Sequence, residues 1–281
     1  MKAQAIRVAV VTGTTHGIGR VTARELARAG YRVVMLCRNS AAASSVRSSI
    51  CAAVPTALVE VVACDLASLA SVRAAAAAVC SGFAPIDLLI NNAAIVSSSH
   101  RTSDDGFELV FATNHLGPFL LTELLRPYLA PQARIINVAS SAHFRGGLAL
   151  ERVADPRAPY RAVAAYAQSK LANVLHAFAL ARRLADTGIT VNCLHPGVVA
   201  TNLLPRWLQM LKPWITRTTF DSERGARSTL YLALEPGLQS TSGRYFDENH
   251  VIQAAAPAAN EIALQEALWT ASAWWTGLHD A

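Results

Sequence analysis

The sequence predicts an α/β protein, a doubly wound parallel β-sheet with helices on both faces, formed by one domain over residues 1–281. Short, almost continuously apolar runs alternate along the chain with longer stretches of helical periodicity. Such runs are typical of strands that are covered on both faces. Strict alternation of strand and helix favours parallel pairing with right-handed crossovers, which is the doubly wound arrangement.

The composition supports this class and excludes several others. Hydrophobic residues make up 52% and charged residues 16% of the chain, which is unlike a disordered, collagen-like or coiled-coil protein. The five cysteines are an odd number without a CxxC pair, so we expect buried thiols in a reducing compartment rather than disulfides or a zinc site. No apolar run reaches the ~18 residues of a membrane span. A cytoplasmic protein is therefore predicted.

The net charge of +6 is spread along the chain without a basic block, so an anionic small molecule explains it as well as nucleic acid would. We expect no nucleic acid partner. In chain order, strands are predicted at Ile6–Val11, Tyr31–Cys37, Leu58–Ala63, Ile86–Ile90, Arg134–Val138 and Ile189–Leu194. Helices are predicted at Ile18–Ala29, Ser40–Ala53, Ser68–Cys80, Asp104–His115, Leu120–Leu129, Tyr160–Asp186 and Glu261–Thr276, the last within a helical extension over 255–281.

A glycine-rich turn joins the first predicted strand to the first predicted helix. Its spacing, G-x-x-x-G-x-G, is formed by Gly13, Gly17 and Gly19. Glycines permit a tight turn and let backbone N–H groups approach a pyrophosphate at a helix N-terminus, as in Rossmann-type domains. The spacing alone is a weak signal, but its place between a strand and a helix strengthens it. The residues expected to line this cradle are Gly13, Thr15, His16, Gly17, Ile18 and Gly19.

The end of the second predicted strand indicates which dinucleotide binds. An acidic residue about 20 positions after the glycines normally holds the adenosine ribose hydroxyl. Arg38 lies in this place, 19 positions after Gly19. A guanidinium pairs with a 2′-phosphate, whereas an acid repels it, so the sequence predicts NADP(H). An ordinary surface arginine at a strand end is the alternative interpretation.

Tyr166 and Lys170 stand four positions apart on the long predicted helix, so their side chains share one face. A phenol with a pKa near ~10 is a poor acid–base at neutral pH unless its anion is favoured, which an ammonium one turn away would do. The pair has little specificity alone. Combined with the glycine turn, it predicts proton transfer to or from a substrate held beside a dinucleotide.

Several motifs, in this order, resemble the single-domain form of the short-chain dehydrogenase/reductase family over roughly residues 5–250. The stretches 114–122 and 166–175 are most similar to the retinol-dehydrogenase and WW-domain-oxidoreductase branch. The residues that carry the resemblance are Thr12-Gly13 to Gly19, Asp65, Asn91-Asn92-Ala93-Ala94, Asn114, Ser140-Ser141, Tyr166 to Lys170, and Pro196-Gly197 to Thr201.

The resemblance implies specific catalytic roles. Tyr166 would donate the proton, and Lys170 would lower the pKa of Tyr166 and hold the nicotinamide ribose. Ser141, preferred over Ser140 as the second serine of the pair, would hydrogen-bond the substrate oxygen, and Asn114 would orient a water that leads to Lys170. Further cofactor contacts implied by the resemblance are Asp65, Leu66, Asn92, Ala93, Tyr166, Lys170, Pro196, Gly197, Val199 and Thr201.

The chain departs from the family pattern in two places. Ala94 stands where glycine is usual, and Tyr166 follows Ser141 by 25 positions, a longer interval than is usual in the family. Beyond Thr201, the aromatic and apolar segment 203–220, with Trp207 and Trp214, is predicted to form a lid over an apolar substrate. Core packing or a contact in a homodimer is the alternative for this segment.

These observations predict an NADP(H)-dependent oxidoreductase that interconverts a carbonyl and an alcohol, on a bulky apolar ketone or aldehyde. Two alternatives remain at this point. One is a non-catalytic NADP(H)-binding regulator or scaffold, and the other is a sugar-nucleotide epimerase or dehydratase, although the latter usually has a different glycine spacing and a longer C-terminal domain. The eight histidines do not pair at metal-ligand spacing, so no metal site is expected.

Overall fold

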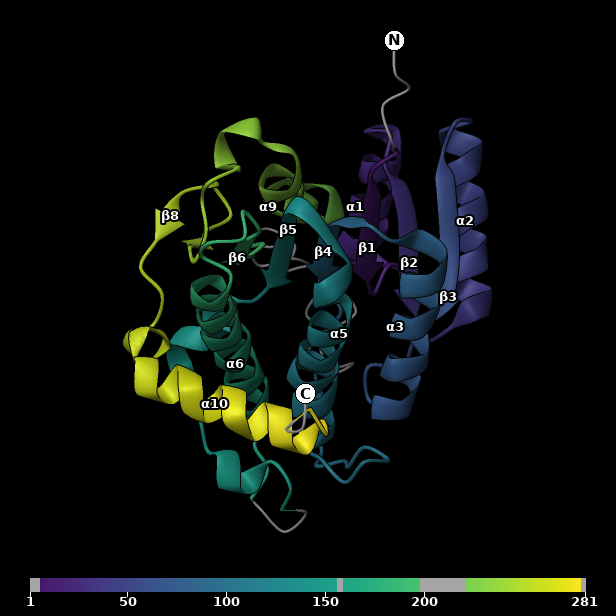
Figure 1. Ribbon diagram of the computed structural model, residues 1–281. Helices are drawn as coiled ribbons and strands as arrows, with labels where there is room; N and C mark the ends of the chain where they lie inside the picture. Colours follow the sequence, from purple (N-terminus) through teal and green to yellow (C-terminus); the bar gives the residue numbers. More distant parts are fainter. Residues whose placement is uncertain (1–5, 156–158, 198–220, 279–281) are drawn as a thin grey trace.

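The β-sheet carries the architecture of the molecule. The computed structural model describes residues 6–155, 159–197 and 221–278, and Figure 1 shows the sheet at its centre. The strands are β1 (Val8–Thr12), β2 (Arg32–Cys37), β3 (Leu58–Ala63), β4 (Ile86–Asn91), β5 (Leu129–Val138), β6 (Thr190–Leu194), β7 (Tyr245–Phe246) and β8 (Ile252–Gln253). Their order is β3-β2-β1-β4-β5-β6-β7-β8, and the order reverses between β1 and β4. A ligand site is expected at this reversal, at the carboxyl ends of the strands.

The predicted fold class is confirmed, with one difference at the sheet edge. Every strand pair from β3 to β7 is parallel, but β8 pairs antiparallel with β7. The sequence did not predict β7 or β8, because a two-residue strand leaves no periodic signal.

Helices cover both faces of the sheet (Figure 1). The larger helices are α1 (Gly17–Arg28), α2 (Ser40–Ala53), α3 (Leu69–Phe83), α5 (Gly117–Leu125), α6 (Ala162–Arg183), α9 (Ser222–Leu234) and α10 (Ile262–Trp275). Helices α1, α2 and α9 share one buried apolar cluster with the sheet, and α3, α5 and α6 share the other. Burial on both faces explains why the strands are apolar throughout.

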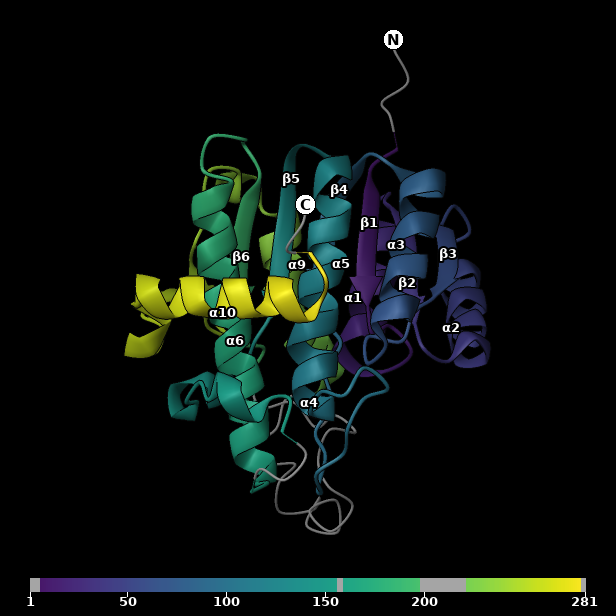
Figure 2. The ribbon, with the colours of Figure 1, turned by 60° about the horizontal axis from the view of Figure 1, so that its bottom comes forward.

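The C-terminal extension packs against the outside of one helical layer. Figure 2 shows α10 running across α6 toward α5. The Trp269 ring lies 5.2 Å from the ring of Phe119 on α5, and the Trp275 ring lies 6.2 Å from that of Phe111. Trp274, by contrast, is 66% exposed. Two of the three C-terminal tryptophans therefore fix α10 to the body of the chain.

The segment predicted as a helix over 104–115 is different in the structure. A turn and an isolated bridge between Thr102 and Glu108 occupy its first half. The Glu108 carboxylate then accepts hydrogen bonds from two backbone N–H groups at 2.8 Å and begins the short α4 (Leu109–Phe111). A π-helix at Ala112–Leu116 follows and leads into α5. Such π-helical turns occur frequently at functional sites.

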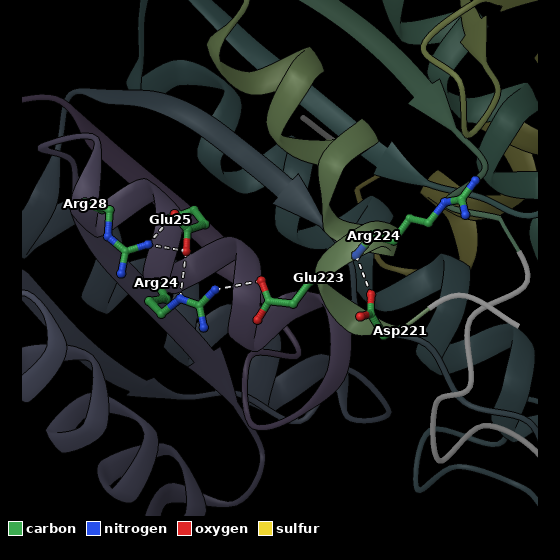
Figure 3. Close-up of polar contacts among 6 residues, drawn as sticks. All are labelled: Arg24, Glu25, Arg28, Asp221, Glu223 and Arg224. Carbon is green, nitrogen blue, oxygen red and sulfur yellow. Dashed lines mark hydrogen bonds and ion pairs between the residues drawn. The ribbon is translucent and has the colours of Figure 1, made fainter. Parts of the chain in front are cut away.

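An ion pair connects α9 to α1, the helix that follows the glycine turn (Figure 3). Glu223 on α9 contacts Arg24 on α1 at 2.7 Å, and Arg24 also contacts Glu25 at 2.7 Å. Asp221 caps α9 by accepting the N–H of Arg224 at 2.8 Å. Exposed pairs of this kind contribute about 0–1 kcal/mol each, so they orient α9 more than they stabilise it.

Three expectations about composition can be compared with the described residues. All five cysteines are free thiols. Within residues 6–155, 159–197 and 221–278, no helix has the length and apolar character needed to cross a bilayer. In the same ranges, no cluster of three or more potential metal ligands is found.

Candidate active site

The glycine turn between β1 and α1 has a shape that only glycine permits. Gly13 and Gly17 have φ values of +71° and +60°, in the left-handed region that side chains disfavour. A Cβ at Gly19 would lie 2.3 Å from the carbonyl oxygen of Gly13 and 2.5 Å from Nδ2 of Asn92. The turn therefore brings its backbone N–H groups to the open N-terminus of α1, where a pyrophosphate would be stabilised.

The end of β4 holds this turn in place. The Asn92 amide donates from Nδ2 to the carbonyl of Thr12 at 2.8 Å and to that of Gly13 at 3.2 Å. The Thr12 hydroxyl in turn accepts the backbone N–H groups of Asn92 and Ala93, both at 3.0 Å. Asn92 thus lines the cleft and also fixes the glycine turn, a role that the sequence did not predict.

A single cleft brings the predicted cofactor residues together at the carboxyl edge of the sheet. Its lining includes Gly13, Thr15, His16, Gly17, Ile18, Gly19, Arg38, Asp65, Leu66, Asn92, Ala93, Tyr166, Lys170 and Pro196. Gly197 is described but does not line the cleft, and Val199, Thr201 and the predicted lid 203–220 lie outside the described residues.

Sequence reasoning missed other lining residues, among them Cys37 and Cys64 at the carboxyl ends of β2 and β3. The Cys37 thiol lies 2.9 Å from the Thr14 hydroxyl, and burial raises the pKa of both thiols, that of Cys64 to about 12. They are therefore unreactive wall groups. The rule that ligands bind at the carboxyl ends of parallel strands could have found them. The unpredicted lining residues are Leu36, Cys37, Asn39, Cys64, Ala94, Ile95, Thr113, Val138 and Ala139.

Arg38 and Asp65 lie at the carboxyl ends of neighbouring strands. Arg38 follows β2 and is exposed at the cleft, where its guanidinium is accessible to an anion. The next residue, Asn39, caps α2 by accepting the N–H of Ala42 at 3.0 Å. Asp65 follows β3, and its Oδ1 accepts the N–H of Ala67 at 3.0 Å. The end of β2 thus presents a cation. An acidic residue at this position would repel a 2′-phosphate.

Lys170 is a fully buried amine at the other end of the cleft. Its Nζ donates to the carbonyl of Val138 at 2.9 Å and lies 5.6 Å from the centroid of the Tyr166 ring. Burial lowers the pKa of Lys170 to about 7, because the ammonium loses its hydration. The side chain can therefore gain or lose a proton near neutral pH.

The pKa of Tyr166 differs from the sequence expectation. Burial raises the pKa of the phenol, and a hydrogen bond with the Ser140 side chain opposes this rise only in part. The expected lowering by Lys170 is therefore not found, since the amine is itself desolvated and partly neutral. Tyr166 consequently stays protonated at neutral pH and is able to donate a proton.

The two serines that follow β5 differ in their surroundings. The Ser140 hydroxyl accepts the backbone N–H of Ala142 at 3.2 Å. Ser140 is the last extended residue after β5, whereas Ser141 begins a 3₁₀ helix (Ser141–Arg145) and is exposed. The assignment of Ser141 as the serine that meets the substrate oxygen stays a prediction.

Asn114 lies in the π-helix, and its carboxamide is fully engaged. Its Oδ1 accepts the N–H of Ile95 at 2.8 Å, and its Nδ2 donates to the carbonyl of Ile95 and to the Ser169 hydroxyl, both at 3.0 Å. The role expected for this side chain, to orient a water that leads to Lys170, stays a prediction. The side chain ties the π-helix to the cleft wall at Ile95 and to α6 next to Lys170.

Comparison with known proteins adds a family to this geometry. Residues 7–212 match the family model described as short chain dehydrogenase. The chain is 44% identical over 280 residues to human dehydrogenase/reductase SDR family member 13, covering 97% of this chain and 74% of that protein. It is 38% identical to human retinol dehydrogenase 13 over 283 residues, covering 97% of this chain and 85% of that protein.

Solved structures give the same result. A putative uncharacterized protein from Mycobacterium paratuberculosis superposes with a TM-score of 0.80 at 34% identity, over 97% of this chain and 94% of the other. A blue fluorescent protein from a metagenomic library, solved in complex with NADPH, superposes with a TM-score of 0.69 at 26% identity, over 86% of this chain and 95% of the other. The resemblance to the retinol-dehydrogenase-like branch is thereby confirmed.

Proposed function

The chain belongs to the short-chain dehydrogenase/reductase family of oxidoreductases, and we propose that it interconverts a carbonyl and an alcohol with NADP(H) as the hydride carrier. One observation supports this most strongly. The glycine turn of β1 and the Tyr166–Lys170 pair of α6 line the same cleft, although they lie far apart in the sequence. A non-catalytic binding protein would not need a proton donor and a buried amine at that place.

The cleft suits a nicotinamide dinucleotide on its own geometry. At Gly19 a Cβ would fill the cradle, and Arg38 presents a cation at the end of β2. When bound, the nicotinamide supplies or accepts the hydride at the carbonyl carbon. We assign the preference for NADP(H) to Arg38, whose planar guanidinium can pair with a 2′-phosphate. The NADPH bound in a structural relative is consistent with this assignment.

Side chains of the protein then transfer the proton. Tyr166 is protonated at neutral pH because burial raises its pKa, so it donates to the carbonyl oxygen as the alcohol forms. The hydroxyl of Ser141, the serine that the family resemblance implies, hydrogen-bonds the same oxygen as negative charge develops on it. Lys170, with a pKa near 7, holds the ribose end and can resupply the proton.

We propose a bulky apolar ketone or aldehyde, such as a retinoid, as the substrate class. Two large hydrophobic side chains are exposed on α6 and on the 3₁₀ turn before it: Phe144 of the turn is 52% exposed, and Val163, three residues before Tyr166 on α6, is 71% exposed. Covering them with an apolar substrate contributes about 25 cal/mol per Å² of buried apolar area. The name of retinol dehydrogenase 13, a relative, points to the same class.

The direct test is to incubate the protein with NADPH or NADH and three carbonyls of falling size, all-trans-retinal, decanal and acetone, and to follow the loss of nicotinamide absorbance. We expect turnover with NADPH, fastest with retinal and slowest with acetone. Equal or faster turnover with NADH would contradict the cofactor proposal. No turnover of any carbonyl, with NADPH bound, would contradict the proposed activity.

A further inference from the structure

We propose that a groove beside the last strand of the sheet is a second ligand site, and that it binds an amphipathic organic anion, a carboxylate that carries an alkyl chain. The groove has a volume of about 670 Å³ and is lined by residues of β8, α6 and α10. It shares no lining residue with the cofactor cleft. A ligand in this groove would therefore be additional to the dinucleotide and would leave the place of the dinucleotide free.

Apolar surface forms a large part of the groove. Phe178 of α6, Ile252 of β8 and Ile262 of α10 all line it. Ile252 is 50% exposed and Ile262 is 60% exposed, so both leave apolar surface in contact with water. Ligand sites in proteins typically measure about 300–1,000 Å³ and are lined mainly by apolar side chains with a few polar groups. An alkyl chain that covers the two isoleucines would remove their surface from water, which favours binding.

The charged residues of the groove are positive. Arg182 and Arg244 line it, and none of the described residues that line it is acidic. The guanidinium of Arg182 is already paired, because it contacts Glu266 on α10 at 2.6 Å and also hydrogen-bonds Gln265. Arg244, by contrast, is exposed, and its guanidinium forms no hydrogen bond or ion pair with a described residue. Arg244 is therefore the cation that a bound anion can reach.

The main chain fixes the position from which the Arg244 side chain extends. The backbone N–H of Arg244 donates to Oδ1 of Asn192 at 3.0 Å, and its carbonyl accepts the N–H of Cys193 at 2.9 Å. Both partners belong to β6, in the interior of the sheet. The planar guanidinium can pair with a carboxylate through two parallel hydrogen bonds. A carboxylate is therefore the anionic group that this end of the groove favours.

The free edge of β8 adds a backbone donor beside the groove. Figure 1 shows β8 at the margin of the sheet, and among the described residues no strand pairs with its outer edge. Asp247, directly after β7, donates its N–H to the carbonyl of Val251 at 3.0 Å. Backbone groups alternate in direction along an antiparallel strand, so those of the next residue, Ile252, point toward the free edge. Such unpaired groups are available to a ligand.

A small molecule fits this groove better than an added peptide strand does. β8 has only two residues, Ile252 and Gln253, so it offers few backbone hydrogen bonds to a further strand. Much of the remaining wall comes from side chains of α6 and α10, which cannot pair with a strand. A carboxylate with an alkyl chain supplies both the charge that complements Arg244 and the apolar contact with the isoleucines.

Isothermal titration calorimetry, with NADPH in excess to fill the cofactor cleft, tests the site with sodium decanoate as the probe. We expect one decanoate to bind per NADPH site. The affinity should rise from hexanoate through octanoate to decanoate by about 3–4-fold per methylene, the effect of burying one CH₂ group. 1-Decanol has the same chain without the charge, and it should bind about 10–100-fold more weakly than decanoate.

Substitutions at Arg244 separate the charge of the groove from its shape. Arg244→Gln should weaken decanoate binding by about 10–100-fold, the loss expected for a charge-assisted hydrogen bond. Arg244→Glu should lose decanoate binding and should bind decylammonium instead, because the charge is reversed. Arg47→Gln, at an exposed arginine on α2, is the matched control and should bind decanoate like the unmodified protein. An unchanged Kd for NADPH in each variant shows that the variant is folded.

Three results would overturn the proposal. One is the absence of decanoate binding to the unmodified protein at concentrations up to about 1 mM, which corresponds to the weak end of specific affinities. Another is equal decanoate affinity in the unmodified protein and in Arg244→Gln, which would place the ligand elsewhere on the chain. The third is 1-decanol binding as tightly as decanoate, which would show that no cation selects the ligand. Reduction of all-trans-retinal with NADPH should be the same in Arg244→Gln as in the unmodified protein, so the proposed oxidoreductase activity is tested separately.

Discussion

The two halves of the sheet build their parts of the cleft in different ways. In the half formed by β1 to β4, the glycine turn determines the geometry almost locally, through the φ values of Gly13 and Gly17 and the missing Cβ of Gly19. In the half formed by β5 to β8, the geometry depends on side chains that contact remote segments, such as Lys170 with the carbonyl of Val138. The backbone therefore shapes the cleft in the first half, and side chains shape it in the second half.

This difference implies different responses to substitution. A cofactor site formed by the backbone loses binding when a Cβ is added, because there is no room for the extra atom. It tolerates changes in the side chains around it. A set of side chains fails when one hydroxyl or one ring nitrogen is lost, even where the backbone is unchanged. Substitutions made in one half at a time therefore test whether cofactor binding and proton transfer can be lost separately.

A large effect is expected in the second half, at the pair of serines. Ser141→Ala should lower kcat by about 10²–10³-fold, the usual cost of losing one donor to a developing oxyanion. Ser140→Ala should have a smaller effect, because the Ser140 hydroxyl accepts the N–H of Ala142 and caps the 3₁₀ turn. Steady-state kinetics with NADPH and all-trans-retinal measure both. The reverse ranking of the two variants would assign the role to Ser140.

A smaller effect is expected in the first half, at Arg38. Arg38→Asp should weaken NADPH binding by about 1.5–3 kcal/mol, the contribution of a charge-assisted hydrogen bond, and should favour NADH. Cofactor fluorescence titration gives both dissociation constants, and Arg47→Asp, at an exposed arginine on α2, is the matched control. A protein with native Arg38 that binds NADH as tightly as NADPH would show that this arginine does not select the cofactor.

A separate effect is expected on stability, through the buried amine of the second half. Burial lowers the pKa of Lys170 to about 7 in the folded state, whereas the unfolded chain keeps an ordinary lysine pKa of about 10.4. Between these two values the unfolded state binds more protons, so this group makes the protein more stable as the pH rises. Below pH 7 its destabilising effect is fully present.

Lys170→Met removes this dependence while filling a similar volume. We expect the free energy of unfolding in urea, taken as unmodified protein minus variant, to increase between pH 7 and pH 10. A difference that is constant over this range would mean that Lys170 keeps an ordinary pKa in the folded protein.

The same comparison explains what sequence reasoning could and could not predict. The glycine turn, Arg38 and the Tyr166–Lys170 pair were found because strand order and helical spacing place each of them without reference to distant segments. The end of β5 could not be treated in this way. Whether Ser140 or Ser141 reaches Tyr166 depends on where the 3₁₀ turn begins.

The sequence could not predict long-range contacts and irregular helices, for the same physical reason. The π-helix at Ala112–Leu116, which holds Asn114 against Ile95 and Ser169, has no periodic signature in the sequence. The hydrogen bond from Ala256 to His143 joins positions that only the folded chain brings together. Helix α10 itself was predicted by its apolar pattern, but not the surface that it covers.

The central claim is that cofactor binding and proton transfer reside in separate parts of one cleft. Its most direct test measures the NADPH dissociation constant and kcat together, in Gly19→Ala and Tyr166→Phe. Gly19→Ala should lose NADPH binding, because its Cβ would lie 2.3 Å from the Gly13 carbonyl oxygen. Tyr166→Phe should bind NADPH like the unmodified protein while kcat falls by about 10²–10⁴-fold, the usual contribution of a positioned general acid. A Tyr166→Phe protein that still reduces the carbonyl at a comparable rate, or that binds NADPH as poorly as Gly19→Ala, would contradict the claim.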